Sequence, residues 1–280
     1  MMVRLEEKKK TASGHEMQTY RWPCANPAAR LLIVHGYLEH AGRYDEFAQY
    51  LTGQGIEVTA FDHRGHGRSA GPRGFVGRFE DYLDDVGTVL DGLGEGPRFL
   101  LGQSMGGLVA LAFAAQRKPR LNGLILTNPY LENALKVPGW KIAVANFLGN
   151  RLPMMSLPAG LDRKLLSHDP EILKAHEADT MILQNANAHW FVEITAAQQR
   201  ASEIAALEVP LLLVVGDRDL VAAPEASLAL FQRLACADKT LDRRSGWFHE
   251  VLNETERATL YEAIAGWISV KGSSPSPGAA

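Results

Sequence analysis

The pentapeptide Gly-Gln-Ser-Met-Gly at residues 102–106 constrains the fold of this chain more than any other feature. It follows an apolar run, Phe99–Leu101, and precedes a helical stretch over Leu108–Lys118. A serine with a glycine two residues away on each side fits a tight turn between a strand and a helix, because no side chain crowds its hydroxyl. The pattern therefore predicts that Ser104 is presented at such a turn, where it can act as a nucleophile.

Further short apolar runs predict strands that are buried on both faces of a sheet. Between them, apolar residues recur at intervals of three and four, as in the expected helix over Phe79–Leu93. Alternating strands and helices are typical of a mostly parallel sheet flanked by helices on both sides. Ahead of it, Val3–Lys10 and Met17–Trp22 are expected to pair as antiparallel edge strands. The remaining expected strands are Leu31–Val34, Ile56–Phe61, Leu124–Leu126 and Leu211–Val215.

One long stretch interrupts this alternation. Between Pro129 and Ala197 we find no buried-strand run, only helix-compatible pieces separated by prolines. Ligands of open α/β sheets bind at the C-terminal edge of the strands, so we expect residues 129–197 to form a helical cap inserted there, after the sixth strand. Residues 1–128 and 198–270 are expected to form the core. Residues 271–280 are rich in Gly, Ser, Pro and Ala, which predicts a disordered tail.

The composition is that of an ordinary globular protein and excludes few functions. With 280 residues, 46% of them apolar and 22% charged, the chain can bury one large core. The net charge is −3 with both signs dispersed, so no nucleic acid partner is expected. Cys24 and Cys236 are too few for a disulfide framework and indicate a reducing compartment. Met1–Lys10 lacks the apolar stretch of a signal peptide, and no apolar run has membrane-spanning length, so we expect a cytoplasmic protein.

A serine hydroxyl is a weak nucleophile, so Ser104 needs a base to accept its proton and an acid to orient that base. In a sheet of this kind, both follow the serine at the ends of later strands. Residues 216–219 read Gly-Asp-Arg-Asp directly after an apolar run, and His249 follows the next expected strand. The order serine, carboxylate, histidine is the expected one. Spacing alone does not choose between Asp217 and Asp219.

Such a serine also requires hydrogen-bond donors for the negative charge that develops on the substrate oxygen. One donor is expected to be the backbone N–H of Met105, directly after the serine. The other should come from the loop after an earlier strand. Leu31–Val34 leads into that loop, and Gly36 lets the backbone turn its next amide inward. We therefore predict the N–H of Tyr37 as the second donor of the oxyanion hole.

The sequence indicates neither a metal site nor a cofactor. His63 and His66 have a His-x-x-His spacing, but they lie on a glycine-rich loop without further ligands in order. A structural loop packed beside the active site is the favoured interpretation. The glycines at 102, 106 and 107 do not form the Gly-x-Gly-x-x-Gly fingerprint of a dinucleotide site.

Five motifs together resemble the monoacylglycerol lipase and lysophospholipase branch of the α/β-hydrolases. They are HGYLEHAGRY at 35–44, DHRGHGRS at 62–69, GQSMGG at 102–107, GDRD at 216–219 and HEVLNE at 249–254. The resemblance implies the α/β-hydrolase fold and a cofactor-free serine hydrolase acting on a small lipid ester. It also implies Asp219 as the acid, because the family's acid stands three residues after the glycine.

The resemblance further implies that Glu39 and Arg43 help to bind the hydroxyls of glycerol. Animal members have a histidine where this chain has Gln103, and a second histidine of glycerol recognition where it has Leu252. Bacterial-type members tolerate both changes. The expected substrate is therefore a monoacylglycerol or a lysophospholipid, without a strict preference for the former.

Other functions of this fold are alternatives: a broad-specificity short-chain carboxylesterase, a peptidase or a perhydrolase. A non-catalytic binding protein is disfavoured, because Ser104, Asp219 and His249 are all present. The sequence does not determine the oligomeric state.

The resemblance also implies an apolar cap helix that meets lipid. Here it would expose an apolar set flanked by the cations Lys141 and Arg151, which would give a transient, peripheral membrane contact. The alternative is that the same residues pack onto the sheet domain. The set is Trp140, Ile142, Val144, Phe147 and Leu148.

Overall fold

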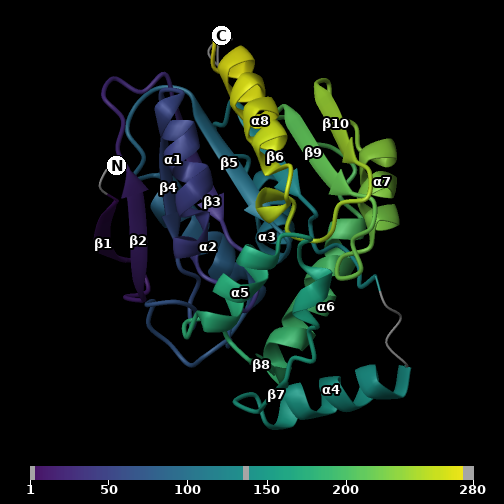
Figure 1. Ribbon diagram of the computed structural model, residues 1–280. Coiled ribbons are helices and arrows are strands. Elements are labelled where there is room, and N and C mark those ends of the chain that lie inside the picture. The colour runs from purple at the N-terminus through teal and green to yellow at the C-terminus, as the bar shows by residue number, and fades with distance from the viewer. Residues whose placement is uncertain (1–3, 135–138, 274–280) are drawn as a thin grey trace.

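The computed structural model describes residues 4–134 and 139–273 and is built around an eight-stranded sheet (Figure 1). Its strands are β1 (Leu5–Lys10), β2 (Glu16–Trp22), β3 (Ala29–Val34), β4 (Ile56–Phe61), β5 (Arg98–Gln103), β6 (Gly123–Thr127), β9 (Leu211–Gly216) and β10 (Lys239–Arg244). They lie in the order β1-β2-β4-β3-β5-β6-β9-β10. β2 is antiparallel to both of its neighbours, and the strands from β4 to β10 run parallel.

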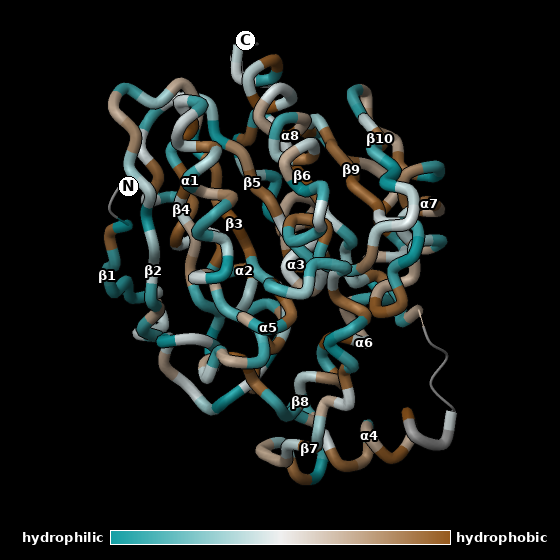
Figure 2. Tube along the Cα trace, in the orientation of Figure 1, coloured by the Kyte–Doolittle hydropathy of each residue, from teal (hydrophilic) through white to brown (hydrophobic). Residues whose placement is uncertain are grey.

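Helices cover both faces of this sheet (Figure 1). On one face lie α1 (Asp45–Gly53) and α8 (Arg257–Gly272), and on the other α2 (Phe79–Leu90), α3 (Met105–Arg117) and α7 (Pro224–Arg233). Alternate residues of a strand point to opposite faces, so Leu31 and Ile33 pack on the α1 side while Leu32 and Val34 pack on the α3 side. Burial on both faces explains why the central strands are mostly hydrophobic (Figure 2).

The predicted fold class, an α/β-hydrolase sheet flanked by helices, is confirmed. Every expected strand overlaps an observed one, including the antiparallel edge pair of β1 and β2. Val3, the start of the expected first strand, lies outside the described residues. The helix expected over Phe79–Leu93 ends earlier, at Leu90. α8 includes Lys271 and Gly272, the first two residues of the expected tail, whereas residues 274–280 lie outside the described residues.

Between β6 and β9 the chain leaves the sheet. It forms α4 (Gly139–Arg151), β7 (Ser156–Pro158), α5 (Pro170–Ala178), β8 (Asn185–Asn187) and α6 (Ala188–Ser202). These elements lie beyond the carboxyl ends of the parallel strands (Figure 1). The two strands pair antiparallel and were not expected, because three residues are too few for an alternating pattern. α6 also joins the main core, where Trp190 and Ile194 are buried with residues of α2 and α3.

The remaining short helices are of the 3₁₀ type: η1 (Ala41–Tyr44), η2 (Arg163–Leu165) and η3 (Val251–Asn253). Among the described segments, no helix is both long and apolar enough to cross a membrane.

Three buried histidines lie beside the ends of β3 and β4. His35 accepts a hydrogen bond at Nε2 from the backbone N–H of His63, at 2.9 Å. His66 is equally buried and contacts the ring of His35 edge-on. Burial lowers the pKa of His63 to about 3 and that of His66 to about 4, and it lowers the pKa of His35 well below 6.5. All three are therefore neutral in the folded protein at neutral pH.

These neutral histidines predict that acid destabilises the fold. In the unfolded chain His66 binds a proton near pH 6.5, but in the folded protein only near pH 4. The free energy of unfolding therefore falls as the pH decreases between these values, by about 1.4 kcal/mol per pH unit for one such histidine. His66→Gln should reduce the measured slope by about that amount in denaturant titrations at pH 4.5–6. An unchanged slope would contradict a buried, neutral His66.

Candidate active site

Ser104 lies at the turn between β5 and α3, as the sequence predicts. Its backbone has φ 55° and ψ −120°, a strained conformation for a residue with a side chain. The turn is closed by hydrogen bonds from the N–H of Ser104 to the carbonyl of Thr127 (3.1 Å) and from the N–H of Gly107 to the carbonyl of Ser104 (2.9 Å). A side chain at Gly106 would collide with the carbonyl of Val34 at the end of β3. The glycine therefore allows the serine turn to contact β3.

His249 connects Ser104 to Asp219. Its Nε2 lies 2.8 Å from the Oγ of Ser104, and its Nδ1 lies 2.7 Å from the Oδ2 of Asp219. The other oxygen of Asp219 accepts the backbone N–H groups of Val221 (2.7 Å) and Ala222 (3.0 Å). These bonds hold the carboxylate in one orientation. The structure thus brings together three side chains that follow β5, β9 and β10.

Asp217, the other candidate acid, is engaged elsewhere. Its Oδ1 accepts the N–H of Gly246 at 2.6 Å, and its Oδ2 lies 3.5 Å from a guanidinium nitrogen of Arg243. Asp217 thereby closes the turn after β10. Of the two carboxylates, Asp219 is the one that contacts His249.

The backbone amides of Tyr37 and Met105 are available beside the serine. In the described part of the chain, neither amide donates a hydrogen bond to another protein group. The loop after β3 lies close to Ser104, because a Cβ built on Gly36 would be 3.2 Å from the Cβ of Ser104. An oxygen atom of a group bonded to Ser104 can accept hydrogen bonds from such free amides.

Ser104 and His249 line a cavity of about 790 Å³. This volume is in the range of sites that bind small organic molecules. Much of the wall comes from the segment between β6 and β9, including residues of η2 and α5. Its apolar members include Leu161, Leu173 and Ile182, a lining that suits a hydrocarbon chain.

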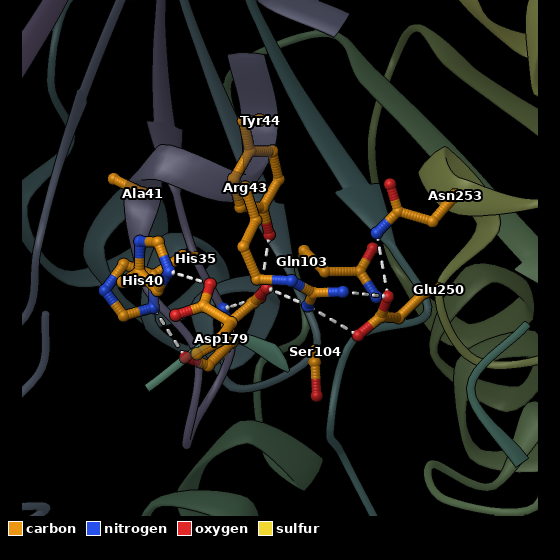
Figure 3. A network of polar contacts seen from close by, with 12 residues as sticks. His35, His40, Ala41, Arg43, Tyr44, Gln103, Ser104, Asp179, Glu250 and Asn253 are labelled. Carbon is orange, nitrogen blue, oxygen red and sulfur yellow. Dashed lines mark hydrogen bonds and ion pairs between the residues drawn. The ribbon is translucent and has the colours of Figure 1, made fainter. Parts of the chain in front are cut away.

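A buried ion network lies next to Ser104 (Figure 3). Arg43 donates to both carboxylate oxygens of Glu250 at 2.7 Å and to Glu39 at 2.8 Å, while Asn253 donates to Glu250 at 2.7 Å. Burial raises the pKa of Glu250, but the charge and hydrogen bonds of Arg43 lower it by a larger amount. The net pKa is about 2. In Figure 3 the hydroxyl of Ser104 points away from Arg43.

The two residues that the resemblance associates with glycerol occupy different places. Glu39 lines the large cavity together with Glu250, and its Oε1 accepts the N–H of Gly36 (2.6 Å) and the hydroxyl of Tyr44 (2.9 Å). Arg43 lies behind both carboxylates. It borders an adjacent cavity of about 10 Å³, which has room for about one water molecule. Arg43 is thus placed to support the carboxylates rather than to line the large cavity.

Two amide side chains to which the sequence analysis assigned no structural role, Gln103 and Asn128, hold the histidine loop. Gln103 donates to the carbonyl of His249 at 3.0 Å, and Asn128 donates to the same carbonyl at 2.8 Å. Asn128 also donates to the carbonyl of Phe248 and accepts the N–H of Gly216, so it links the ends of β6 and β9 to the histidine loop. In the sequence, only the position of Asn128 directly after β6 indicates that it lies near the site.

The His-x-x-His pair lies in the protein interior. His63 contacts the rings of Phe61 and Tyr82, and the Nδ1 of His66 pairs with the carbonyl of Arg64 at 2.9 Å. Across residues 4–134 and 139–273, no cluster of three or more His, Cys, Asp and Glu side chains could hold a metal ion.

Comparison with known proteins identifies the family. Residues 25–256 match the family model described as serine aminopeptidase, S33. The chain belongs to this family of α/β-hydrolases. A monoacylglycerol lipase of Mycolicibacterium smegmatis is 34% identical over 253 residues, which cover 88% of this chain and 90% of that protein. Phospholipase YtpA of Bacillus subtilis is 29% identical, over 87% of this chain and 96% of that protein.

A solved structure agrees with this family assignment. The crystal structure of Paleococcus ferrophilus monoacylglycerol lipase has a TM-score of 0.84 and 33% sequence identity to this S33-family chain. The similarity covers 90% of this chain and 99% of that one.

The surroundings of His249 predict a specific pH dependence. Burial lowers its pKa, but the charge and hydrogen bond of Asp219 raise it more, so the net pKa lies above 6.5. We expect His249 to act as the base for Ser104, and a base must be neutral, so the kcat/KM for a p-nitrophenyl ester should fall as the pH decreases through this pKa. In Asp219→Asn the acidic limb should move to lower pH, and kcat should fall on the order of 10⁴-fold. Profiles at pH 5–9 test this, and a limb that stays in place would contradict it.

Proposed function

We propose that this protein is a serine ester hydrolase that cleaves single-chain lipid esters through an acyl-enzyme intermediate. The observation that carries the proposal is the pair of hydrogen bonds of His249, 2.8 Å to Ser104 and 2.7 Å to Asp219, beside a cavity of about 790 Å³. The similarity to proteins named monoacylglycerol lipase and phospholipase supports a lipid ester as substrate.

The chemistry proceeds in two halves. His249 accepts the proton of Ser104 as the Oγ attacks the ester carbonyl carbon, and the oxyanion accepts hydrogen bonds from the N–H groups of Tyr37 and Met105. The tetrahedral intermediate then collapses, and His249 gives its proton to the leaving alcohol. A water molecule repeats the sequence on the acyl-enzyme and releases the fatty acid. Asp219 stays ionised and stabilises the imidazolium.

The alcohol part of the substrate contacts the two carboxylates of the cavity wall. Glu39 and Glu250 are acceptors, so they suit the hydroxyl groups of glycerol. Arg43 acts through them, because its bonds to both carboxylates hold their orientation. A phosphate group at the same place would meet two carboxylates. We therefore infer a preference for neutral alcohols over phosphorylated ones.

Residues 129–197 serve as the cap in this proposal, above a core of residues 1–128 and 198–270. The boundary at 197 falls inside α6, whose buried residues pack with the core. On α4, Val144 and Phe147 are 48% and 63% exposed, which favours transient contact with a lipid surface. Ile142 and Leu148 are half-buried. The side chains of Trp140 and Lys141, assigned to the same surface, lie outside the described residues.

The acyl-enzyme predicts how a substitution of the nucleophile changes the kinetics. Ser104→Ala removes the attacking oxygen, so kcat for a monoacylglycerol should fall on the order of 10⁴-fold or more. In the wild type, a chromogenic short-chain ester should release a burst of alcohol if acylation is faster than deacylation. Retention of the wild-type rate in Ser104→Ala would remove the proposed mechanism.

The carboxylates at the alcohol side predict the choice of substrate. A 1-monoacylglycerol should be hydrolysed with a kcat/KM at least about tenfold higher than a lysophosphatidic acid with the same acyl chain, because the phosphate meets like charge. The matched chains remove the contribution of the acyl pocket from the comparison. Equal rates for the two substrates would contradict this assignment of the alcohol side.

Peptide cleavage is the second candidate, because the matching family model is described as an aminopeptidase. A p-nitrophenyl ester and an aminoacyl anilide distinguish the two reactions in one plate assay. We expect hydrolysis of the ester and background rates with the anilide. The opposite result would assign the same Ser104 and His249 to a peptidase.

A further inference from the structure

Trp190 of α6 contacts the side chains of both residues whose amides lie beside Ser104. Its ring stacks on the ring of Tyr37, with centroids 3.5 Å apart and planes inclined by 7°. Its indole N–H donates to the sulfur of Met105 at 3.2 Å. Trp190 is 6% exposed, so both contacts are shielded from water. One side chain therefore joins the loop after β3 to the first turn of α3.

Two hydrogen bonds of its hydroxyl hold the Tyr37 ring in place against Trp190. The hydroxyl donates to the carbonyl of Gly74 at 2.9 Å and accepts the N–H of Asn187 at 2.9 Å. Asn187 in turn caps α6, since its Oδ1 accepts the N–H of Trp190 at 3.0 Å. The ring of Tyr37 is thus held on its face by Trp190 and at its hydroxyl by Asn187, the residue that caps α6.

We propose that Trp190 is a positioning residue for the oxyanion hole. This inference rests on the proposed function, in which the N–H groups of Tyr37 and Met105 hold the oxyanion. The two amides come from loops that are far apart in sequence, and they must converge on one oxygen at 2.7–3.1 Å. A displacement of about 1 Å at such a site costs up to about 100-fold in rate. Trp190 fixes the separation of the two loops by touching both.

The rival role for Trp190 is that of a cavity wall, because it also lines the space beside Ser104. A wall residue affects every ligand that fills the acyl pocket. Replacement of a positioning residue weakens binding most for ligands that place a negative charge in the oxyanion hole. The two roles are therefore separated by comparing a transition-state analogue with a ground-state ligand that has the same chain.

Octylboronic acid and 1-octanol provide this comparison. The boron forms a bond to the Oγ of Ser104 while His249 accepts the proton, and a boron-bound oxygen takes the position of the oxyanion. 1-Octanol has the same eight carbons and forms no such adduct. We would measure both inhibition constants, together with kcat, KM and the melting temperature, for wild type, Trp190→Leu and Trp190→Phe.

The proposal makes a graded prediction. In Trp190→Leu, kcat falls by about 10- to 100-fold while KM changes by less than about threefold, and the inhibition constant rises for the boronic acid but not for the alcohol. Trp190→Phe keeps a ring on Tyr37 and loses the hydrogen bond to Met105, so it should lie between Trp190→Leu and wild type. The matched control is Trp267→Phe on α8, a half-buried tryptophan packed on Phe99, which should leave kcat and both constants unchanged.

Two results would overturn the inference. If both inhibition constants rise together and the loss lies in KM, Trp190 is only a cavity wall, and the proposed hydrolase function still stands. If Trp190→Leu does not fold, the test rests on Trp190→Phe. In that variant, a ratio of the inhibition constants for the boronic acid and the alcohol equal to that of the wild type contradicts the inference. A wild-type protein that hydrolyses no ester would instead remove the proposed function itself.

Discussion

The strained turn at Ser104 is the constraint on which the rest of the site depends. A residue with a side chain is held at φ 55° because the turn is hydrogen-bonded on both sides and packed against the end of β3. Gly106 allows that contact, since a side chain there would collide with the carbonyl of Val34, and Gly102 leaves room for the first turn of α3. The same contact places the loop after β3 next to Ser104. One close approach therefore places Ser104 beside the backbone amides of Tyr37 and Met105 that we propose as oxyanion donors.

The parallel sheet accounts for the convergence of distant residues. β5, β6, β9 and β10 all end at one edge, so side chains that follow them meet there although Ser104 and His249 are 145 positions apart. Asn128 reinforces this edge by bonding to both Gly216 and the carbonyl of His249. Asp219 is not the only carboxylate among the described residues that affects His249, because Glu250 and Glu39 also raise its pKa. Arg43 pairs with both carboxylates, and its single positive charge offsets only part of their negative charge.

Much of the fold and the chain order of Ser104, Asp219 and His249 could be predicted, because both leave local patterns. A strand buried on both faces must be apolar throughout, and the serine turn requires its glycines. The choice between Asp217 and Asp219 has no such pattern, since both follow β9 and only the turn geometry separates them. The places of Arg43, Asn128 and Trp190 depend on contacts between segments far apart in sequence. Periodicity in one segment contains no information about those contacts.

The central claim is that Ser104 is the nucleophile, and mass spectrometry of a covalently labelled protein tests it most directly. A fluorophosphonate should add to the wild type once, on the tryptic peptide of residues 99–117, and the adduct and the esterase activity should be lost together. Ser104→Ala should give neither adduct nor activity. An active wild type that carries the adduct on another residue, or that stays active when Ser104 is fully labelled, would contradict the account.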